Sequence, residues 1–328
     1  MANSILSFGL PVYNNAAMLD DALSYFYDEL ELDDFHLYVS DNGSTDSTAQ
    51  VLQKHAAKHT NLHCFIQEKN RGTEWNAFFL QEKCETKYFM LLADYVRLYK
   101  KQIFNIVEML QNNDYDFIVF NDSTRLNYGA SKTYTDINKV LTDLGWYMTH
   151  MSAIIYSKEI FKTIVPQYIY QQGSEFYGLI RIFSYIAGKD TCNVYWYAED
   201  CVYFSPKKKD SAWYGRVMYV WVEQYVETIL SLPALYNLES KLRCLKSFYE
   251  GSVIFQFITF VYHIKRKEIS AKNIYQYRRH LPFILKFDWR ILLFISILPH
   301  PLVNVVFLIT RLLRKLKYIT ARRTPRAL

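Results

Sequence analysis

The sequence predicts an α/β fold in which helices sandwich a mostly parallel sheet, followed by a helical C-terminal extension. Short apolar runs alternate with amphipathic, helix-like segments from Ser4 to Phe120, and long helical patterns dominate from Trp213 onward. The 328 residues are 51% hydrophobic and 17% aromatic, a composition that excludes a disordered or low-complexity chain. The protein therefore folds around a large core.

Five apolar runs in the first part of the chain predict strands. Each is rich in β-branched or aromatic residues and ends at a polar or turn residue. The predicted strands are Ser4–Leu10, His36–Ser40, Leu62–Ile66, Tyr88–Ala93 and Asp116–Phe120.

Helical spacing in the segments between these runs predicts four helices, with start signals such as Ser44 and Thr73. The predicted helices are Ala16–Leu30, Thr45–His59, Thr73–Cys84 and Lys101–Asn112. Alternating strands and helices imply a parallel sheet whose ligands bind beyond the carboxyl ends of its strands. Three polar strand exits should then share one crevice, namely Pro11–Asn15, Asp41–Asp46 and Asp94–Arg97.

Mixed elements follow, and they define the expected domain division. We expect strands near Ser152–Tyr156, Asn193–Tyr197 and Cys201–Phe204, and a helix near Ser174–Ala187. The α/β pattern ends near Lys207. The expected domains are 1–206, with halves 1–122 and 123–206, and a helical region 207–328 whose tail covers about 287–328.

The positive charge of the chain is confined to its C-terminal part. The formal net charge is +6, but residues 265–328 contain 15 basic and 2 acidic residues, so residues 1–264 carry −7. A nucleic-acid-binding domain would carry a basic face with interleaved aromatic residues. Because the α/β part is acidic, we expect no nucleic-acid partner.

The tail contains an uncharged stretch, Ile291–Thr310, flanked by Arg290 and by a basic cluster that begins at Arg311. Its length of 20 residues suits a bilayer core, but Pro299-His300-Pro301 would break a straight span. The pattern therefore favours two short apolar helices that lie on the membrane surface, with basic residues on anionic headgroups. A true span and a helical pair packed on the soluble core remain alternatives.

The strongest local motif is the segment 39–48, Val-Ser-Asp-Asn-Gly-Ser-Thr-Asp-Ser-Thr, in which an apolar strand ends in an acidic turn. An ordinary strand-to-helix turn with Ser44 as N-cap would give the same pattern. Two other segments argue for more than that. Leu10-Pro11-Val12-Tyr13-Asn14-Asn15 leaves the first strand, and Asn70-Arg71-Gly72 precedes a helix.

Together these segments resemble the family 2 glycosyltransferases over roughly residues 3 to 205. The resemblance implies a GT-A (Rossmann-type) fold that binds a nucleoside diphosphate sugar at the strand ends. It implies that Pro11 and Tyr13 lie along the base and that Asp41 accepts a hydrogen bond from it, which suits a uracil imide. Arg71 is expected near the base or the phosphates, and Asp94 is expected to face the ribose.

The chain departs from the family pattern after Asp94. Family members usually carry a second acidic residue here for a divalent cation that bridges the diphosphate, whereas this chain has Tyr95 and Val96. Neither side chain suits Mg²⁺ or Mn²⁺. We therefore expect no protein metal ligand at this position and a metal-independent or weakly metal-dependent reaction, in which Arg97 or Arg71 stabilises the leaving diphosphate.

The resemblance also implies an acidic general base at the start of a helix on the acceptor side. Glu175, in the polar aromatic loop 171–178, fits this position. A first-turn Glu that only stabilises the helix dipole is the structural alternative. Asp200, expected just before a strand, is the second candidate base.

The sequence thus predicts an inverting glycosyltransferase that uses a UDP-sugar and a lipid-linked saccharide acceptor, as in bacterial surface-polysaccharide synthesis. The N-terminus lacks a signal-peptide pattern and the five cysteines have no paired spacing, so we expect the cytosolic face of the membrane. A catalytically inactive donor-binding subunit is the alternative. A nucleotidyltransferase would need a glycine-rich loop that Pro11–Asn14 lacks. Whether the chain acts alone, as a homo-oligomer or in a glycosyltransferase complex stays open.

Overall fold

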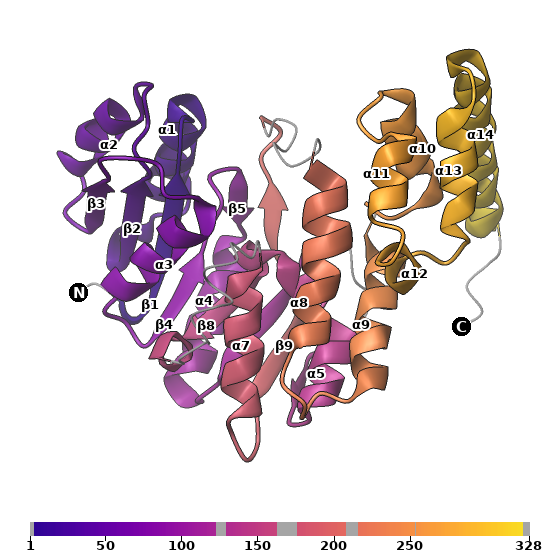
Figure 1. Ribbon diagram of the computed structural model, residues 1–328. Helices are drawn as coiled ribbons and strands as arrows, with labels where there is room; N and C mark the ends of the chain where they lie inside the picture. Colours follow the sequence, from indigo (N-terminus) through magenta and orange to yellow (C-terminus); the bar gives the residue numbers. More distant parts are fainter. Residues whose placement is uncertain (1–2, 123–128, 163–175, 208–215, 253, 324–328) are drawn as a thin grey trace. The chain divides into compact units, whose positions relative to one another are not determined.

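The computed structural model describes residues 3–122, 129–162, 176–207, 216–252 and 254–323 (Figure 1). The chain divides into two compact units. The first comprises Met1–Asp210 and Ser231–Ser240, and the second comprises Ser211–Leu230 and Lys241–Leu328. The predicted class, an α/β sheet structure with C-terminal helices, is confirmed.

The first unit is built on one sheet with strand order β3-β2-β1-β4-β8-β6-β9-β5, and β7 pairs with β9. The strands are β1 (Asn3–Val12), β2 (Phe35–Asp41), β3 (Leu62–Ile66), β4 (Tyr88–Leu91), β5 (Val96–Leu98), β6 (Phe117–Asp122), β7 (Lys132–Tyr134), β8 (Ile154–Ser157) and β9 (Val194–Phe204). Strands β3, β2, β1 and β4 are mutually parallel, and β6 and β9 are parallel to each other. Strand β8 is antiparallel to β4 and β6, and β5 and β7 are antiparallel to β9.

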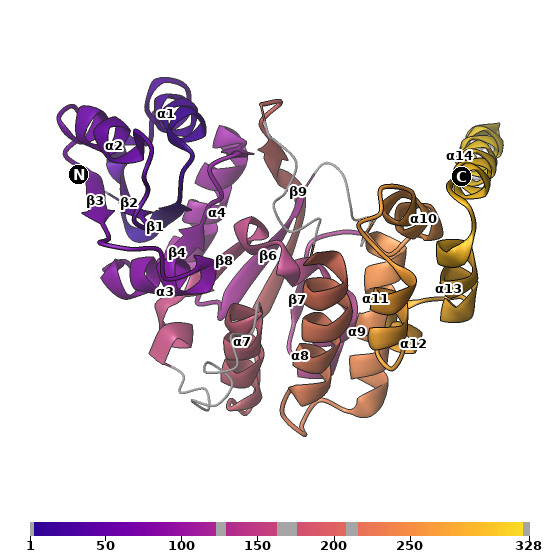
Figure 2. The same cartoon turned by 45° about the horizontal axis from the view of Figure 1, so that its top comes forward.

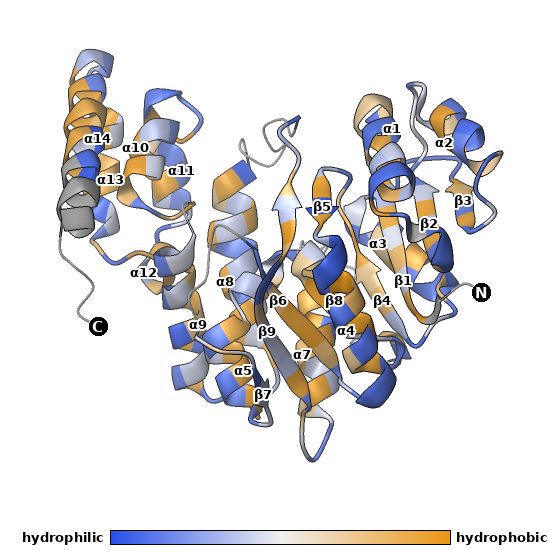
Figure 3. Ribbon diagram, turned by 180° about the vertical axis from the view of Figure 1, so that it is seen from behind, coloured by the Kyte–Doolittle hydropathy of each residue, from blue (hydrophilic) through white to orange (hydrophobic). Residues whose placement is uncertain are grey.

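Helices cover both faces of this sheet (Figures 1 and 3). Helices α3 and α7 lie on one face, where the Arg181 guanidinium of α7 is 5.1 Å from the ring centroid of Phe78 in α3. Helices α1 and α4 lie on the other face, where Phe104 of α4 packs against Phe35 of β2 with ring centroids 5.8 Å apart. The helical segments are α1 (Ala16–Ser24), η1 (Tyr25–Glu29), η2 (Leu32–Asp34), α2 (Thr48–Ala56), α3 (Thr73–Lys83), α4 (Lys100–Asn112), α5 (Ile137–Leu144), η3 (Tyr147–Thr149), η4 (Met151–Ala153), η5 (Lys158–Lys162) and α7 (Tyr177–Ala187).

The sequence prediction missed β5, β7 and α5, and three further features of this unit differ from it. The two expected strands 193–197 and 201–204 form one strand, β9, because pairing with β6 continues through register shifts opposite Asn121 and Asp122. Helix α2 begins at Thr48, and not at Thr45, because the Asp46 carboxylate accepts the Thr48 backbone N–H at 3.0 Å. The expected helix to Leu30 changes to π-helical geometry at Tyr25.

From Met218 the described chain is helical (Figure 2). The segments are η7 (Met218–Gln224), α8 (Tyr225–Ser231), α9 (Leu238–Gly251), α10 (Phe257–Lys265), α11 (Ala271–Gln276), α12 (Leu281–Ile284), α13 (Trp289–Ile297) and α14 (His300–Arg323). Phe248 is central to the packing of the second unit, with ring centroids 5.1 Å from Trp221, 4.8 Å from Tyr225 and 4.9 Å from Phe255.

The C-terminal apolar stretch is interrupted at Leu298-Pro299, as the proline pattern predicts, so α13 and α14 are separate helices. Helix α14 is longer than expected because no helix-breaking residue occurs between Leu302 and Arg323. Within the described residues, no helix combines the length and apolar character that crossing a bilayer requires.

Candidate active site

Three strand ends converge at one edge of the first unit's sheet. In the register of β1 and β2, Val12 pairs with Asp41, and β4 adjoins β1 on the other side, with Leu91 opposite Gly9. The loops that follow these strands are joined to each other by hydrogen bonds. Asn15 Nδ2 donates to Asp94 Oδ2 at 2.5 Å. The loops after β1 and β4, predicted to share a crevice, are therefore in contact.

The loop after β1 is also bound to the acidic turn after β2. The Asn14 backbone N–H donates to Ser44 Oγ at 2.8 Å, and Asn14 Oδ1 accepts the Thr45 backbone N–H at 2.8 Å. Asn14 adopts a positive φ of 48°, a conformation that Asn tolerates better than most residues. Tyr13 is left 44% exposed beside this junction. The polar residues of the two motifs thus fix the loops and leave the aromatic ring available.

Asp41 lies at the centre of this arrangement and is 1% exposed. Its Oδ1 accepts the Ser44 backbone N–H at 3.0 Å. Its Oδ2 is enclosed and has no hydrogen-bond partner among the described residues. A buried carboxylate oxygen without a donor is costly. Such a site is satisfied when a ligand N–H supplies the missing hydrogen bond.

The Asn70-Arg71-Gly72 segment is held against the acidic turn through Asn42. Asn42 Nδ2 donates to Asn70 Oδ1 at 3.0 Å and to the Gly72 carbonyl at 3.1 Å, and Asn42 Oδ1 accepts the Arg71 backbone N–H at 3.1 Å. The Arg71 guanidinium is 4.6 Å from the Trp75 ring centroid, and Arg71 is exposed. The backbone of this segment is therefore anchored beside the acidic turn, and its arginine is an exposed cation that lies over Trp75.

Gly43 allows this close approach of the acidic turn to the 69–72 segment. Its φ is +71°, and an added Cβ would lie 2.6 Å from the Lys69 backbone. We expect Gly43→Ala to lower the free energy of unfolding by roughly 3 kcal/mol, because strain and a backbone clash add together. Gly72→Ala is the control, since Gly72 has φ +93° but no atom within 4 Å of an added Cβ, and should cost only about 1 kcal/mol. Urea unfolding measures both, and equal losses would contradict the clash.

Asp94 is 9% exposed and is the acidic residue at the end of β4. Burial raises the pKa of Asp94, and the hydrogen bond from Asn15 opposes this shift. The side chain of Tyr95 packs towards Phe204 at 6.0 Å between ring centroids, and Val96 is fully buried in β5. Within the described residues, no group of three His, Cys, Asp or Glu side chains could hold a metal ion. The strand end thus presents one carboxylate, that of Asp94, which accepts a hydrogen bond from Asn15.

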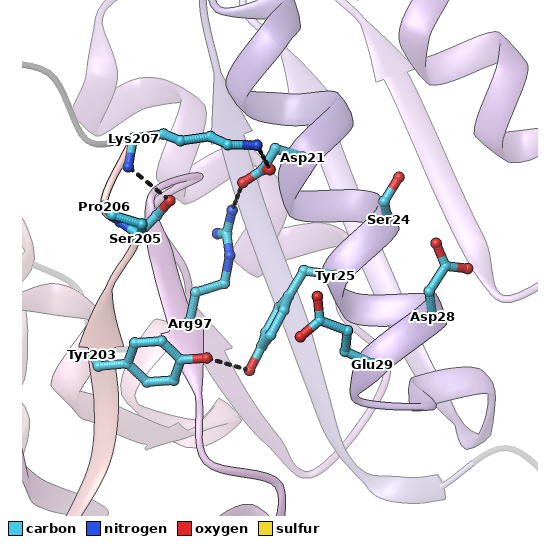
Figure 4. A pocket seen from close by; sticks show the side chains of 10 residues that line it. All are labelled: Asp21, Ser24, Tyr25, Asp28, Glu29, Arg97, Tyr203, Ser205, Pro206 and Lys207. Carbon is cyan, nitrogen blue, oxygen red and sulfur yellow. Dashed lines mark hydrogen bonds and ion pairs between the residues drawn. The ribbon is translucent and has the colours of Figure 1, made fainter.

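Arg97 is buried next to Asp94, and its guanidinium is already engaged by other groups. Its guanidinium donates to the carbonyls of Asp94 and Val96 at 2.8 and 3.0 Å and pairs with Asp21 of α1, which also pairs with Lys207. Figure 4 shows this network beside a cavity of about 280 Å³. The cavity is lined by Asp21, Ser24, Tyr25, Asp28, Glu29, Arg97, Tyr203, Ser205, Pro206 and Lys207. A phosphate-binding role for Arg97 stays a prediction, and it would require Arg97 to exchange its pairing with Asp21.

The Asp21 network gives a prediction for stability. Lys207 and Arg97 hold the pKa of Asp21 below its ordinary value of 3.8, although burial opposes them. A lowered folded-state pKa stabilises the protein above about pH 3.8, and this contribution is lost as pH falls through the folded-state pKa. Asp21→Asn should therefore cost about 2 kcal/mol near neutral pH, since it leaves the buried Arg97 charge without its carboxylate.

Thermal unfolding of the Asp21→Asn variant at neutral and acidic pH tests this. The difference from the parent should shrink below pH 3.8. Asp28→Asn, an exposed residue of the same cavity, is the control and should change stability by less than about 0.5 kcal/mol. A loss of equal size at all pH values would show that the Asp21 charge is not what stabilises the fold.

The structure describes only one of the two candidate bases on the acceptor side. Glu175 lies outside the described residues, just before Phe176 and α7. Asp200 lies within β9, and not before a strand as expected, and pairs in register with Asn121. Burial raises the pKa of Asp200, with further increases from the negative charges of Asp122 and Glu199.

Asp122 and its neighbour His150 were not selected by sequence reasoning as site residues. Asp122 ends β6, is 1% exposed, and has its Oδ2 3.4 Å from His150 Nδ1. Asp122 carries the same signal as Asp41 and Asp94, an aspartate at the end of an apolar strand. The pairing with His150 depends on tertiary contacts that the sequence pattern does not report.

Comparison with known proteins agrees with this arrangement. Residues 7–165 match the family model described as Glycosyl transferase family 2. A structure of TarS from S. aureus is similar with a TM-score of 0.50 and 16% identity, covering 85% of this chain and 49% of that chain. The mannosyltransferase PcManGT from Pyrobaculum calidifontis, in complex with GDP-Man and Mn²⁺, has a TM-score of 0.50 and 15% identity, covering 76% of each chain.

This chain spans about half the length of that TarS chain. No curated protein matches it. At these identities the two solved structures establish the fold, and the residues matched by the family model include the motifs at the strand ends. Residues 7–165 therefore form a glycosyl transferase family 2 domain, and the chain has the GT-A fold.

Proposed function

We propose that the protein transfers a sugar from a UDP-sugar to a saccharide acceptor held at the cytosolic face of a membrane, with inversion at the anomeric carbon. The observation that carries the nucleotide assignment is the enclosed Asp41 Oδ2 atom, which lacks a donor among the described residues. The imide N–H of uracil is such a donor. A cytosine ring presents an acceptor at the corresponding position, so Asp41 would discriminate between the two pyrimidines.

The remaining site residues suit the other parts of this donor. We expect Pro11 and the exposed Tyr13 ring to flank the base, and Asp94 to face the ribose hydroxyls. The Arg71 guanidinium, anchored through Asn42, would approach the diphosphate. In an inverting transfer the acceptor oxygen bonds to the anomeric carbon as the bond to the diphosphate breaks. A carboxylate, Glu175 or Asp200, takes the acceptor proton, and the nucleoside diphosphate leaves.

We further propose that this reaction depends weakly or not at all on a divalent cation. PcManGT was solved with Mn²⁺, and a cation in such a site neutralises charge on the departing diphosphate. In this chain Tyr95 and Val96 follow Asp94, and Asp94 accepts from Asn15. The positive charge would then come from Arg71.

Turnover is accordingly expected to persist in excess EDTA, measured as UDP release with an acceptor present. Arg71→Ala should lower kcat about 100-fold, whereas Arg71→Lys, which keeps the charge, should retain a larger share of the rate. Loss of turnover in EDTA with recovery on adding Mn²⁺ would contradict the proposal.

One observation favours a second candidate, a catalytically inactive subunit that binds the nucleotide sugar. The same replacement of the acidic metal-ligand position by Tyr95 or Val96 would also follow from loss of catalysis. The two candidates differ in a simple respect. An inactive subunit binds UDP but neither transfers nor hydrolyses the sugar with any acceptor.

The deciding experiment is a thermal-shift panel of nucleotide sugars, with and without Mn²⁺, because a ligand raises the melting temperature only if it binds the folded state. We expect UDP-sugars to raise the melting temperature and cytidine and adenine nucleotides to leave it unchanged. Preference for a GDP-sugar would overturn the uracil assignment. No stabilisation by any nucleotide sugar would overturn the donor assignment as a whole.

A further inference from the structure

Exposed apolar side chains gather on the two last helices. Among the described residues, nine of the seventeen large hydrophobic side chains that are exposed lie in α13 and α14, each at least 45% exposed. They are Ile291, Phe294, Ile297, Leu302, Val305, Leu308, Ile309, Leu312 and Leu313. Figure 3 shows the hydrophobic character of both helices. Contiguous exposure of this kind marks an interaction surface.

The spacing of these residues places them along one side of each helix. On α14, Leu302, Val305, Ile309 and Leu312 follow each other at intervals of three and four residues, so they lie along one side of the helix. Leu308 and Leu313 flank this row. On α13, Ile291, Phe294 and Ile297 recur every three residues. We call these nine residues the apolar face.

A different side of α14 packs against α10 within the second unit. Val303 is 4% exposed, and Phe307 lies 5.9 Å from the Tyr262 ring of α10, with Lys265 Nζ 4.8 Å from the Phe307 centroid. If α14 served only to pack against the rest of this unit, it would need apolar residues only on the side that carries Val303 and Phe307. The apolar face is therefore additional to the packing of the fold.

Positive charge accompanies the apolar face. Arg311, Arg314 and Lys315 are exposed on α14, which contains no acidic residue. Residues 265–328 carry 15 basic and 2 acidic residues. A helix with an apolar face and basic flanks is the arrangement that lies in the interface of an anionic bilayer, with its apolar side chains among the lipid headgroups and upper acyl chains.

We propose that the apolar face of α13 and α14 docks the protein on a bilayer containing anionic phospholipid, with α14 in the plane of the membrane. Opposite charges favour this partner, whereas a second copy of the chain would bring two strongly basic segments together. Docking is independent of donor binding, and it would hold the enzyme at the surface where the proposed acceptor lies.

The test is flotation of the full chain with vesicles of phosphatidylcholine alone or with phosphatidylglycerol added. We expect binding to the anionic vesicles only, weakening as salt is raised. Leu308→Glu with Leu312→Glu should lower binding at least about tenfold. Leu235→Glu with Leu238→Glu is the matched control, because each of these two leucines is 63% exposed and lies outside the apolar face. This control has the same net charge as the Leu308/Leu312 variant, and it should bind vesicles like the parent. Exchanging Arg311, Arg314 and Lys315 for Gln should also lower binding at least tenfold.

Failure of the parent chain to bind anionic vesicles would overturn the proposal, and so would unchanged binding of the Leu308/Leu312 variant. Gel filtration of that variant detects the other occupant, because conversion of a dimer into monomers with vesicle binding intact would make the face a subunit interface. UDP thermal shifts on all variants separate this outcome from the proposed catalytic function. If the chain floats with vesicles but UDP does not raise its melting temperature, only the proposed catalytic function is contradicted. If UDP raises the melting temperature but the chain does not bind vesicles, only the proposed docking surface is contradicted.

Discussion

Replacing Asp41 by Asn is expected to lower the affinity for UDP about 100-fold, as measured by isothermal titration calorimetry. We expect this loss of affinity because the two carboxylate oxygens of Asp41 differ in their hydrogen bonding. Oδ1 accepts the Ser44 backbone N–H, whereas Oδ2 lacks a partner among the described residues. In Asn the carbonyl oxygen can still accept from Ser44, but an NH₂ group replaces the free oxygen and faces the uracil imide donor. A charged hydrogen bond is lost and two donors are opposed.

Stability in the absence of ligand provides the control for Asp41→Asn. If Asp41 were a structural carboxylate, the variant would unfold more easily. If its second oxygen serves a ligand, the buried charge is a cost to the folded state without ligand, and its removal should leave the free energy of unfolding within about 1 kcal/mol or raise it. A destabilised variant that keeps full UDP affinity would contradict the nucleotide assignment.

Residues close in sequence account for the parts of the fold that the sequence predicted well. Strand β3 has the predicted limits and α3 begins at the predicted Thr73, because hydrophobic periodicity and helix-start signals act over a few residues. Strand β9 was split in the prediction because Glu199-Asp200 interrupts its apolar pattern. Its continuity comes from pairing with β6, which lies more than seventy residues earlier in the chain.

The same limit applies to the candidate site, because local sequence patterns do not report contacts between distant parts of the chain. The motif residues at the ends of β1, β2 and β4 could be placed at one edge, since parallel strands end on the same side. The ion pair of Arg97 could not be predicted from the sequence, because its carboxylate partner, Asp21, is 76 positions away in the chain and lies on a helix. Charge and position alone made Arg97 and Arg71 equivalent candidates for the diphosphate. The ion pair with Asp21 separates them and makes Arg71 the stronger candidate.

The second large effect is expected for the general base. Glu175→Gln should lower kcat by about 10²- to 10⁴-fold and leave UDP affinity unchanged, because the amide cannot take the acceptor proton while the nucleotide contacts lie elsewhere. Single-turnover transfer from a radiolabelled donor measures the rate, and calorimetry measures the affinity. Asp200→Asn is the matched variant, since it removes the other candidate carboxylate with the same change in charge.

The pH profile distinguishes the two carboxylates further. A general base works in its deprotonated form, so kcat should rise with pH through the pKa of the group that acts. Burial, with Asp122 and Glu199, raises the pKa of Asp200. If Asp200 were the base, the acid limb of the parent profile would therefore lie above the ordinary aspartate range, and Asp200→Asn would abolish that limb together with the rate. A Glu175→Gln variant that keeps most of the parent rate would assign the role to Asp200. A collapsed rate in Glu175→Gln, together with near-normal turnover in Asp200→Asn, would assign proton removal to Glu175.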